Sequence, residues 1–206
     1  MSVGVKRAIG SGAVILLRTG KHPAAEELSL EGISFETFDE IYESAANFEE
    51  VYSRIADEVI GRSMAGDVVY CVPGHPLMGE EAVRLILQKA RESGIETRIL
   101  GSMSFIEASL EELGESIDQG LKIIDALSTQ EIRPDTDVPN LFYQVYDRII
   151  ASELKLSLLE VYPDEFEVYL IIGAGTKDGK VEKLPLFELD RREYDYLTSV
   201  FVPQLR

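Results

Sequence analysis

The chain has 206 residues, 45% of them hydrophobic, which predicts a globular fold with a sizeable core. Its net charge of −17 argues against nucleic acid as a partner, because nucleic-acid binding needs clustered Lys and Arg, and against an anionic membrane surface. The single cysteine, Cys71, has no intrachain disulfide partner. No signal peptide or apolar run of about twenty residues is recognisable, so a cytoplasmic protein is expected.

The first half of the chain alternates predicted strands and helices. Short apolar or alternating runs predict the strands, which are expected at 13–17, 33–38, 67–72 and 97–100. Apolar residues at helical spacing predict the helices, which are expected at 24–30, 48–63 and 80–92. Helices of this length between strands imply right-handed crossovers and a mainly parallel sheet.

The second half has fewer helices and tighter turns. Its strands are expected at 120–127, 140–146, 167–172 and 181–186, and its helices at 104–113, 147–160 and 189–197. This pattern predicts a smaller domain with a mixed sheet. The expected fold class is therefore α/β, with domains at 1–116 and 117–206 and a cleft between them.

The Pro73-Gly74-His75-Pro76 turn follows the predicted strand 67–72 and leads directly into a helix. Open α/β proteins hold small ligands outside the carboxyl ends of their strands. Glycine lets a ligand approach the backbone, the prolines stiffen the turn, and the helix start offers free N–H groups. The same pattern is also typical of a plain strand–helix connector, and the residues alone leave both interpretations open.

His22 and His75 each precede a proline where a predicted strand ends. Histidines at the ends of parallel strands can line one crevice, and either can act as an acid or a base. The alternative in each place is a surface or helix-capping histidine.

Two further loops contain small residues. Gly101, Ser102, Met103 and Ser104 join a predicted strand to a helix, and Ser104 with Glu107 predicts a capping box, which is compatible with a ligand loop. Gly173-Ala174-Gly175-Thr176 lacks the full GxGxxG pattern, so no dinucleotide fingerprint is inferred.

No metal site is expected, because the two histidines and the cysteine are far apart in the sequence. The acidic pairs are interpreted as solvated helix faces; they are Glu26-Glu27, Glu49-Glu50, Glu80-Glu81 and Glu111-Glu112.

Five segments together carry a family resemblance: 67–87, 101–108, 139–148, 159–168 and 197–203. In this order they resemble the tetrapyrrole (corrin/porphyrin) methylase superfamily. More closely, they resemble the methylase-like domain that precedes a MazG-type nucleotide pyrophosphohydrolase in YabN-like bacterial proteins. The resemblance implies an S-adenosylmethionine-dependent methyltransferase fold with two α/β domains, the cofactor in the cleft between them, and a homodimer as the usual assembly.

The resemblance also implies site residues by position. The cofactor-binding residues are Pro73, Gly74, His75, Pro76, Leu77, Met78, Gly101, Ser102, Met103, Ser104, Gln144, Val145, Ala174, Gly175 and Thr176. Arg18, His22 and His75 are the expected catalytic groups on the side of the small-molecule acceptor, whose identity stays open. Methyl transfer depends mainly on alignment, with a base needed only where the acceptor must lose a proton.

The family normally opens with a strand and a Gly-x-Gly-Pro-Gly-type loop. Residues 1–6 align just after that point, so the first strand and loop are expected to be absent. The chain stops where the pyrophosphohydrolase domain begins in the fused forms, which makes such a domain an expected partner. The rival hypothesis is a non-catalytic scaffold or regulatory domain of a pyrophosphohydrolase. Pyrophosphohydrolase activity of the chain itself is not expected, because no acidic motif is spaced to hold Mg²⁺ on facing helices.

Overall fold

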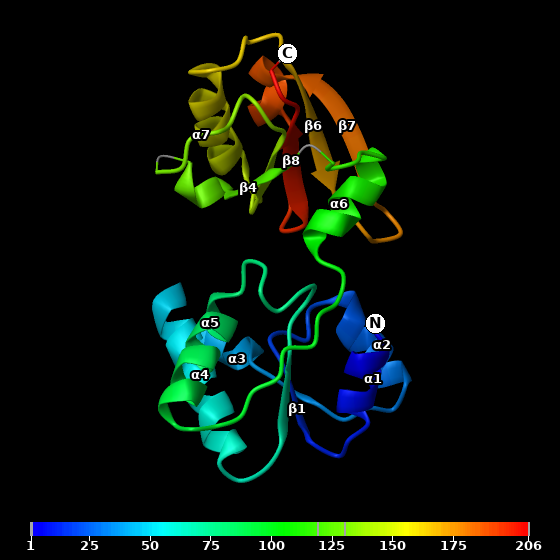
Figure 1. Ribbon diagram of the computed structural model, residues 1–206, viewed down its shortest axis with the longest axis vertical. Coiled ribbons are helices and arrows are strands. Elements are labelled where there is room, and N and C mark those ends of the chain that lie inside the picture. The colour runs from blue at the N-terminus through cyan, green and yellow to red at the C-terminus, as the bar shows by residue number, and fades with distance from the viewer. Residues whose placement is uncertain (1, 119, 130, 206) are drawn as a thin grey trace. The chain divides into compact units, whose positions relative to one another are not determined.

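The computed structural model describes residues 2–118, 120–129 and 131–205. The chain divides into two compact units, Met1–Ser104 and Phe105–Arg206, which run from blue to green and from green to red in Figure 1. The expected domains met after residue 116. Helix α6 (Phe105–Leu113) belongs to the second unit.

The first unit has a parallel sheet of three strands. Its elements are α1 (Val3–Ile9), β1 (Val14–Leu17), α2 (Pro23–Leu30), β2 (Glu36–Thr37), α3 (Asp39–Ser44), α4 (Phe48–Ser63), β3 (Val68–Cys71) and α5 (Glu81–Glu92). The strand order is β2-β1-β3, with Leu16 opposite Tyr70. Strand β1 is apolar on both faces, as buried parallel strands are. Its Ile15 and Leu17 pack in one cluster with α1 and α2, and Leu16 packs in another with α4 and α5.

Local sequence signals set the ends of the long helices. The Asn47 side chain caps α4 by accepting a hydrogen bond from the N–H of Glu50 (2.9 Å). The Glu50 carboxylate in turn accepts from the N–H of Ala46 (3.0 Å), so the helix start resembles a capping box. Gly94, with φ of +68°, follows the end of α5, where the left-handed conformation favours glycine.

The expected strand at 97–100 is wrong. These residues have no regular secondary structure and pair with no strand among the described residues. No strand among the described residues lies beside this segment to accept and donate the backbone hydrogen bonds that a strand needs. The expected strand at 33–38 shortens to the two residues of β2, and helix α1 was not predicted.

The second unit has a mixed sheet of five strands. Its elements after α6 are β4 (Lys122–Asp125), the 3₁₀ helix η1 (Ala126–Ser128), β5 (Asn140–Tyr143), α7 (Arg148–Leu159), β6 (Glu167–Ile172), β7 (Lys180–Pro185), the 3₁₀ helix η2 (Leu186–Arg191) and β8 (Thr198–Val202). The order is β4-β5-β8-β6-β7, in which only the β4–β5 pair is parallel. Helix α7 and η2 pack in one core cluster with the sheet, and α6 packs in another. The α/β fold class, with a parallel sheet followed by a mixed one, is confirmed.

The expected helix at 189–197 is also wrong. A 3₁₀ helix ends at Arg191, and Thr198–Val202 forms strand β8, which lies between β5 and β6. All five residues of β8 are buried. Burial on both faces of the sheet therefore explains why residues 198–202 form a strand. No helix in the described part of the chain is both long enough and apolar enough to cross a membrane.

Candidate functional site

The first set of predicted site residues lies where β1 and β3 end. These strands are parallel neighbours, so their carboxyl ends meet at one edge of the sheet. Arg18 directly follows β1, and its N–H donates to the carbonyl of Cys71, the last residue of β3 (2.9 Å). The turn after β3 contains Pro73, Gly74, His75, Pro76, Leu77 and Met78. The structure therefore brings Arg18 and this turn to the same edge.

The turn after β3 packs against the segment 101–104. Gly74 has φ of +78°, which favours glycine, and a Cβ built on it would lie 3.8 Å from the carbonyl oxygen of Met103. A Cβ on Gly101 would lie only 2.8 Å from Nε2 of His75, so the imidazole ring occupies space that another residue's side chain would need. The two predicted cofactor loops of the first unit thus lie side by side.

Large apolar side chains of these loops are open to solvent. The exposed fractions are 55% for Leu77, 40% for Met78 and 49% for Met103. Ser104 is 4% exposed, so little of it can reach a ligand. The loops therefore offer a ligand mainly apolar side chains and backbone groups.

Both histidines use Nδ1 to accept a backbone hydrogen bond from the second residue after them. The donor is the N–H of Ala24 for His22 and the N–H of Leu77 for His75, each at 3.1 Å. His22 is the N-cap of α2, so the capping interpretation holds for its Nδ1 atom. Burial, and after it the positive charge of Arg18, lowers the pKa of His22. Nε2 is the atom of His22 that the cap leaves for other interactions.

Sequence reasoning missed Glu80. Its carboxylate pairs with the Arg18 guanidinium (Oε1–Nη1 3.0 Å), and the Glu80 side chain is only 7% exposed, so the solvated interpretation is wrong for this residue. Burial raises the pKa of Glu80 to about 7, against the lowering effect of Arg18. The Tyr70 hydroxyl is buried without a hydrogen-bond partner, and burial raises the pKa of Tyr70. Glu81, the residue after Glu80, is solvated as the sequence indicated, and it pairs with Arg84 (2.6 Å).

The second set of predicted site residues lies in the second unit. Strands β5 and β6 are both antiparallel to β8, so their carboxyl ends lie at one edge of the mixed sheet. Gln144 and Val145 follow β5, and Ala174, Gly175 and Thr176 follow β6 by one residue. The structure therefore brings these five residues to the same edge.

Three details of this edge restrict what it can do. Gln144 has φ of +63°, the one positive value of a non-glycine residue among the described residues, and such a conformation costs about 1–2 kcal/mol. The Val145 side chain is fully buried, so only its backbone can face a ligand. Thr176 is held by its own hydroxyl, which donates to the carbonyl of Gly173 (2.7 Å).

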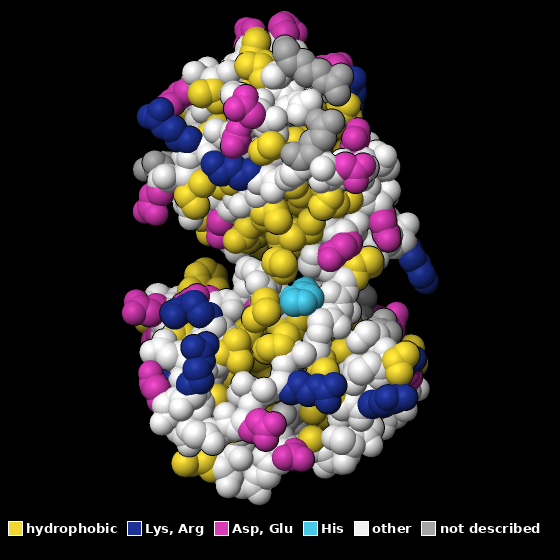
Figure 2. Space-filling view, in the orientation of Figure 1, with side chains coloured by type: hydrophobic (Ala, Val, Ile, Leu, Met, Phe, Trp, Pro, Cys, Tyr) yellow, Lys and Arg dark blue, Asp and Glu magenta, His cyan; other side chains and the backbone are white. Residues whose placement is uncertain are grey.

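Asp125 and Tyr143 form a second feature that the sequence did not reveal. They lie opposite each other at the ends of β4 and β5, and the Tyr143 hydroxyl hydrogen-bonds to the Asp125 carboxylate. Burial raises the pKa of Asp125 and of Tyr143. Within the described ranges, no three His, Cys, Asp or Glu side chains are grouped as metal ligands. On the face seen in Figure 2, Lys and Arg side chains are scattered and form no continuous basic patch.

Each unit is thus an α/β unit in which the predicted ligand loops follow strands that run in the same direction. Residues 1–190 match the family model "Tetrapyrrole (Corrin/Porphyrin) Methylases". The chain belongs to this family.

A curated relative and several solved structures match the chain. The Bacillus subtilis (strain 168) protein described as "Uncharacterized protein YabN" is 35% identical over 209 residues; the match covers 100% of the chain and 42% of that protein. The chain therefore spans less than half the length of this relative.

The similar structures share the fold at low sequence identity. Uroporphyrin-III-C-methyltransferase from Thermus thermophilus has a TM-score of 0.72 at 16% identity, covering 100% of the chain and 86% of that protein. A putative diphthine synthase from Entamoeba histolytica has a TM-score of 0.71 at 13% identity, covering 100% and 87%. Cobalt precorrin-4 methyltransferase has a TM-score of 0.68 at 12% identity, covering 98% and 88%.

Proposed function

We propose that the chain binds S-adenosylmethionine and transfers its methyl group to a small-molecule acceptor. The observation that carries the proposal is the packing of the Gly74–His75 turn against the Gly101–Met103 segment. These are the two loops expected to hold the cofactor in the first unit. Membership in the methylase family and the fold shared with solved methyltransferases support the same reading.

The residue types at the loops suit this cofactor. S-adenosylmethionine supplies an electrophilic methyl group on a sulfonium centre, whose reaction needs alignment more than proton transfer. Leu77, Met78 and Met103 offer exposed apolar surface, and a glycine backbone at position 74 permits close approach. In the second unit, the strained backbone at Gln144 is typical of a ligand-holding position.

The acceptor side is assigned to Arg18, His22 and His75. The Nδ1 atom of His22 accepts the capping hydrogen bond, so the neutral ring, which its lowered pKa favours, carries its proton on Nε2. His22 can therefore donate a hydrogen bond from Nε2 to a polar group of the acceptor. Arg18 is held by Glu80 and retains guanidinium donors for a polar acceptor group.

Calorimetric titration with S-adenosylmethionine and with S-adenosylhomocysteine tests the proposal. Saturable binding is expected for both, and Gly74→Val should abolish it, because valine is strained at φ of +78° and fills the approach to the turn. Gly61→Ala is the matched control, since Gly61 lies in α4 with open space around it. No heat at millimolar ligand contradicts the proposal and favours the rival hypothesis of a non-catalytic scaffold for a pyrophosphohydrolase.

The assembly is proposed to be a homodimer. Sedimentation velocity at several concentrations tests this, and a monomer at every concentration would contradict it.

A further inference from the structure

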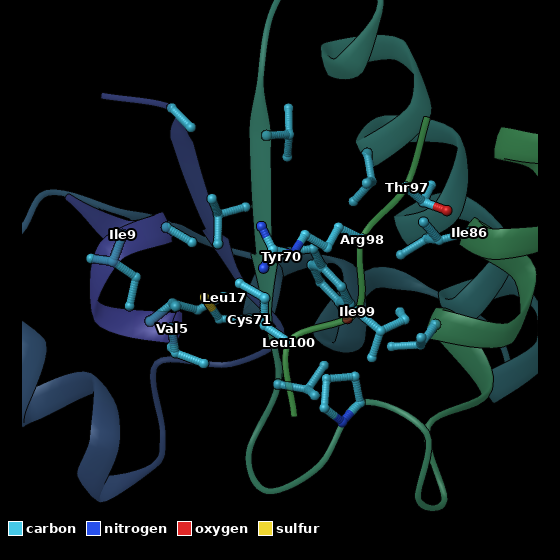
Figure 3. A pocket seen from close by; sticks show the side chains of 18 of the residues that line it. Val5, Ile9, Leu17, Tyr70, Cys71, Ile86, Thr97, Arg98, Ile99 and Leu100 are labelled. Atoms are coloured by element: carbon cyan, nitrogen blue, oxygen red, sulfur yellow. The ribbon is translucent and has the colours of Figure 1, made fainter. Parts of the chain in front are cut away.

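The groove shown in Figure 3 has a volume of about 780 Å³ and is lined in part by His22, Pro73 and Gly74. It therefore belongs to the candidate site of the first unit. A separate groove of about 660 Å³ lies within the second unit. Segments 115–118 and 165–169, together with residues that end or follow β8, contribute most of its lining, and we call it the acidic groove.

The acidic groove lies at the edge of the mixed sheet where β5 and β6 begin. Pro139 directly precedes β5, Glu167 is the first residue of β6, and Pro203 directly follows β8, which is antiparallel to both. The predicted cofactor segments 144–145 and 174–176 instead follow β5 and β6, so they lie at the opposite edge of this sheet. The acidic groove is therefore distinct from the predicted cofactor residues of this unit.

The apolar lining of the acidic groove is an aromatic part of the sheet that α6 leaves uncovered. Tyr169 and Phe201 are opposite each other on β6 and β8, and their rings meet edge to face with centroids 6.1 Å apart. Both residues belong to the cluster on which α6 packs, yet no residue of α6 lines the groove. The two rings thus give the groove an apolar surface that can contact another molecule.

The charged side chains of the acidic groove are all carboxylates among its described lining residues, and they are Glu115, Asp118, Glu165 and Glu167. Glu167 pairs with Lys183 (2.7 Å), whereas no Lys, Arg or His in the described part of the chain forms an ion pair with the other three. Nor are the carboxylates grouped as metal ligands within the described ranges. They therefore suit an occupant with several separate cationic groups and not a single metal ion.

Lys183 illustrates how a cation fits beside this lining. Its ammonium group lies 5.8 Å from the centre of the Tyr169 ring and 2.7 Å from a carboxylate oxygen of Glu167. A ring face and a carboxylate next to each other attract ammonium and guanidinium groups. Arginine suits such a place better than lysine, because the planar guanidinium stacks on a ring and can bind a carboxylate through two donors.

We propose that the acidic groove is a docking site for a segment of a partner protein that contains both arginine and apolar side chains. Charge complementarity carries the proposal: the arginines pair with Glu115, Asp118 and Glu165, and the net charge of −17 attracts a basic partner from a distance. The apolar side chains contact the rings of Tyr169 and Phe201. A polyamine supplies charges without guanidinium planes or apolar side chains, so a peptide fits this lining better. The proposal does not depend on methyl transfer.

Binding of a designed peptide tests the proposal. The probe is a fluorescein-labelled peptide in which arginine alternates with leucine, and the control peptide has citrulline in place of every arginine, which removes the charge and keeps the shape. Fluorescence anisotropy should show saturable binding of the probe and at least tenfold weaker binding of the citrulline peptide. No binding of the probe at millimolar concentration, or equal binding of both peptides, would overturn the proposal.

Two double variants separate the groove from the general negative charge of the chain. Asp118→Asn with Glu165→Gln removes two carboxylates from the groove and should weaken binding of the probe at least tenfold. Glu153→Gln with Glu160→Gln removes the same charge at exposed positions outside the groove and should change the affinity less than twofold. All four positions are exposed, so a folding defect is not expected. Equal effects of the two double variants would show non-specific attraction and overturn the proposal.

Hydrogen exchange and competition identify the place and the kind of occupant. The probe should slow exchange in segments 115–118 and 165–169, and protection confined to other segments would overturn the proposal. Spermidine should displace the probe only at a concentration at least tenfold above that of unlabelled peptide. Displacement by spermidine at the same concentration would overturn the proposal in favour of a small polycation as the occupant.

Discussion

Arg18 and Glu80 form an ion pair with an Nη1–Oε1 distance of 3.0 Å, and this pair joins the segments that follow two neighbouring parallel strands. The Glu80 side chain is 7% exposed and that of Arg18 is 32% exposed. The pair therefore ties the loop that contains His22 to the turn that contains His75, in a partly water-excluded place.

Removing the cation of this pair should destabilise the chain. Arg18→Met leaves the buried Glu80 carboxylate without its partner, and we expect the free energy of unfolding to fall by about 2 kcal/mol. This loss is smaller than for a fully buried pair, because Arg18 is partly solvated. Arg84→Met is the control at an exposed pair and should leave stability nearly unchanged. Urea denaturation measures both; equal losses would show that the Arg18–Glu80 pair behaves as a surface pair.

Glu80 should make stability depend on pH between about 4.5 and about 7. Its folded pKa is raised to about 7 from 4.5, so the folded state binds more protons than the unfolded state in this window. Its contribution to stability is therefore complete below pH 4.5 and is lost as the pH rises through 7, on the order of 3 kcal/mol in all.

Glu80→Gln should remove this dependence, so that the variant gains stability relative to the parent chain as the pH rises. Glu81→Gln should act in the opposite direction, because Arg84 lowers the pKa of Glu81. A stability difference between Glu80→Gln and the parent chain that does not change with pH would contradict the assigned burial of Glu80.

The close contact between His75 and Gly101 predicts a non-additive pair of substitutions. Gly101→Ala places a methyl group 2.8 Å from Nε2 of His75, and we expect a loss of about 1–3 kcal/mol of stability and weaker cofactor binding. In the His75→Ala background the same substitution should cost less than about 0.5 kcal/mol, because the ring is gone. Chemical denaturation of the four proteins gives the coupling energy; additive losses would contradict the contact.

The strained residue Gln144 predicts a trade-off. Gln144→Gly should raise the free energy of unfolding by up to about 1 kcal/mol, since glycine adopts φ of +63° without strain. The same variant should bind S-adenosylmethionine less tightly, because it is freer to leave the ligand-holding conformation. Gln88→Gly, within α5, should instead lose about 1 kcal/mol. If Gln144→Gly binds S-adenosylmethionine as tightly as the parent chain, the strained backbone at this position does not contribute to cofactor binding.

Much of the fold could be predicted because its elements carry strong local patterns. The helix 48–63 and the strand 167–172 were predicted with the observed bounds, since one has a regular apolar face and the other a run of β-branched and apolar residues. The strand at 97–100 failed for a reason that lies in tertiary structure: the backbone partner that a strand needs is not placed beside it. Strand β8 was missed because burial at the centre of a sheet decides its structure.

The candidate site was predicted in part. The sequence indicated the turn after β3, and the structure adds its contact with Gly101 and Met103. Glu80 was missed because an acidic pair at a helix start is usually solvated, and only the pairing with Arg18, 62 residues earlier in the chain, reveals its burial. Spatial pairing between distant residues is the information that periodicity does not contain.

Hydrogen exchange with saturating S-adenosylhomocysteine tests whether the four predicted segments hold the cofactor. We expect slower exchange in the two loops of the first unit, 73–78 and 101–104, and in the two segments of the second unit, 144–145 and 174–176, with unchanged exchange in α4. If none of these segments exchanges more slowly at a millimolar ligand concentration, the proposal that these residues hold the cofactor is contradicted.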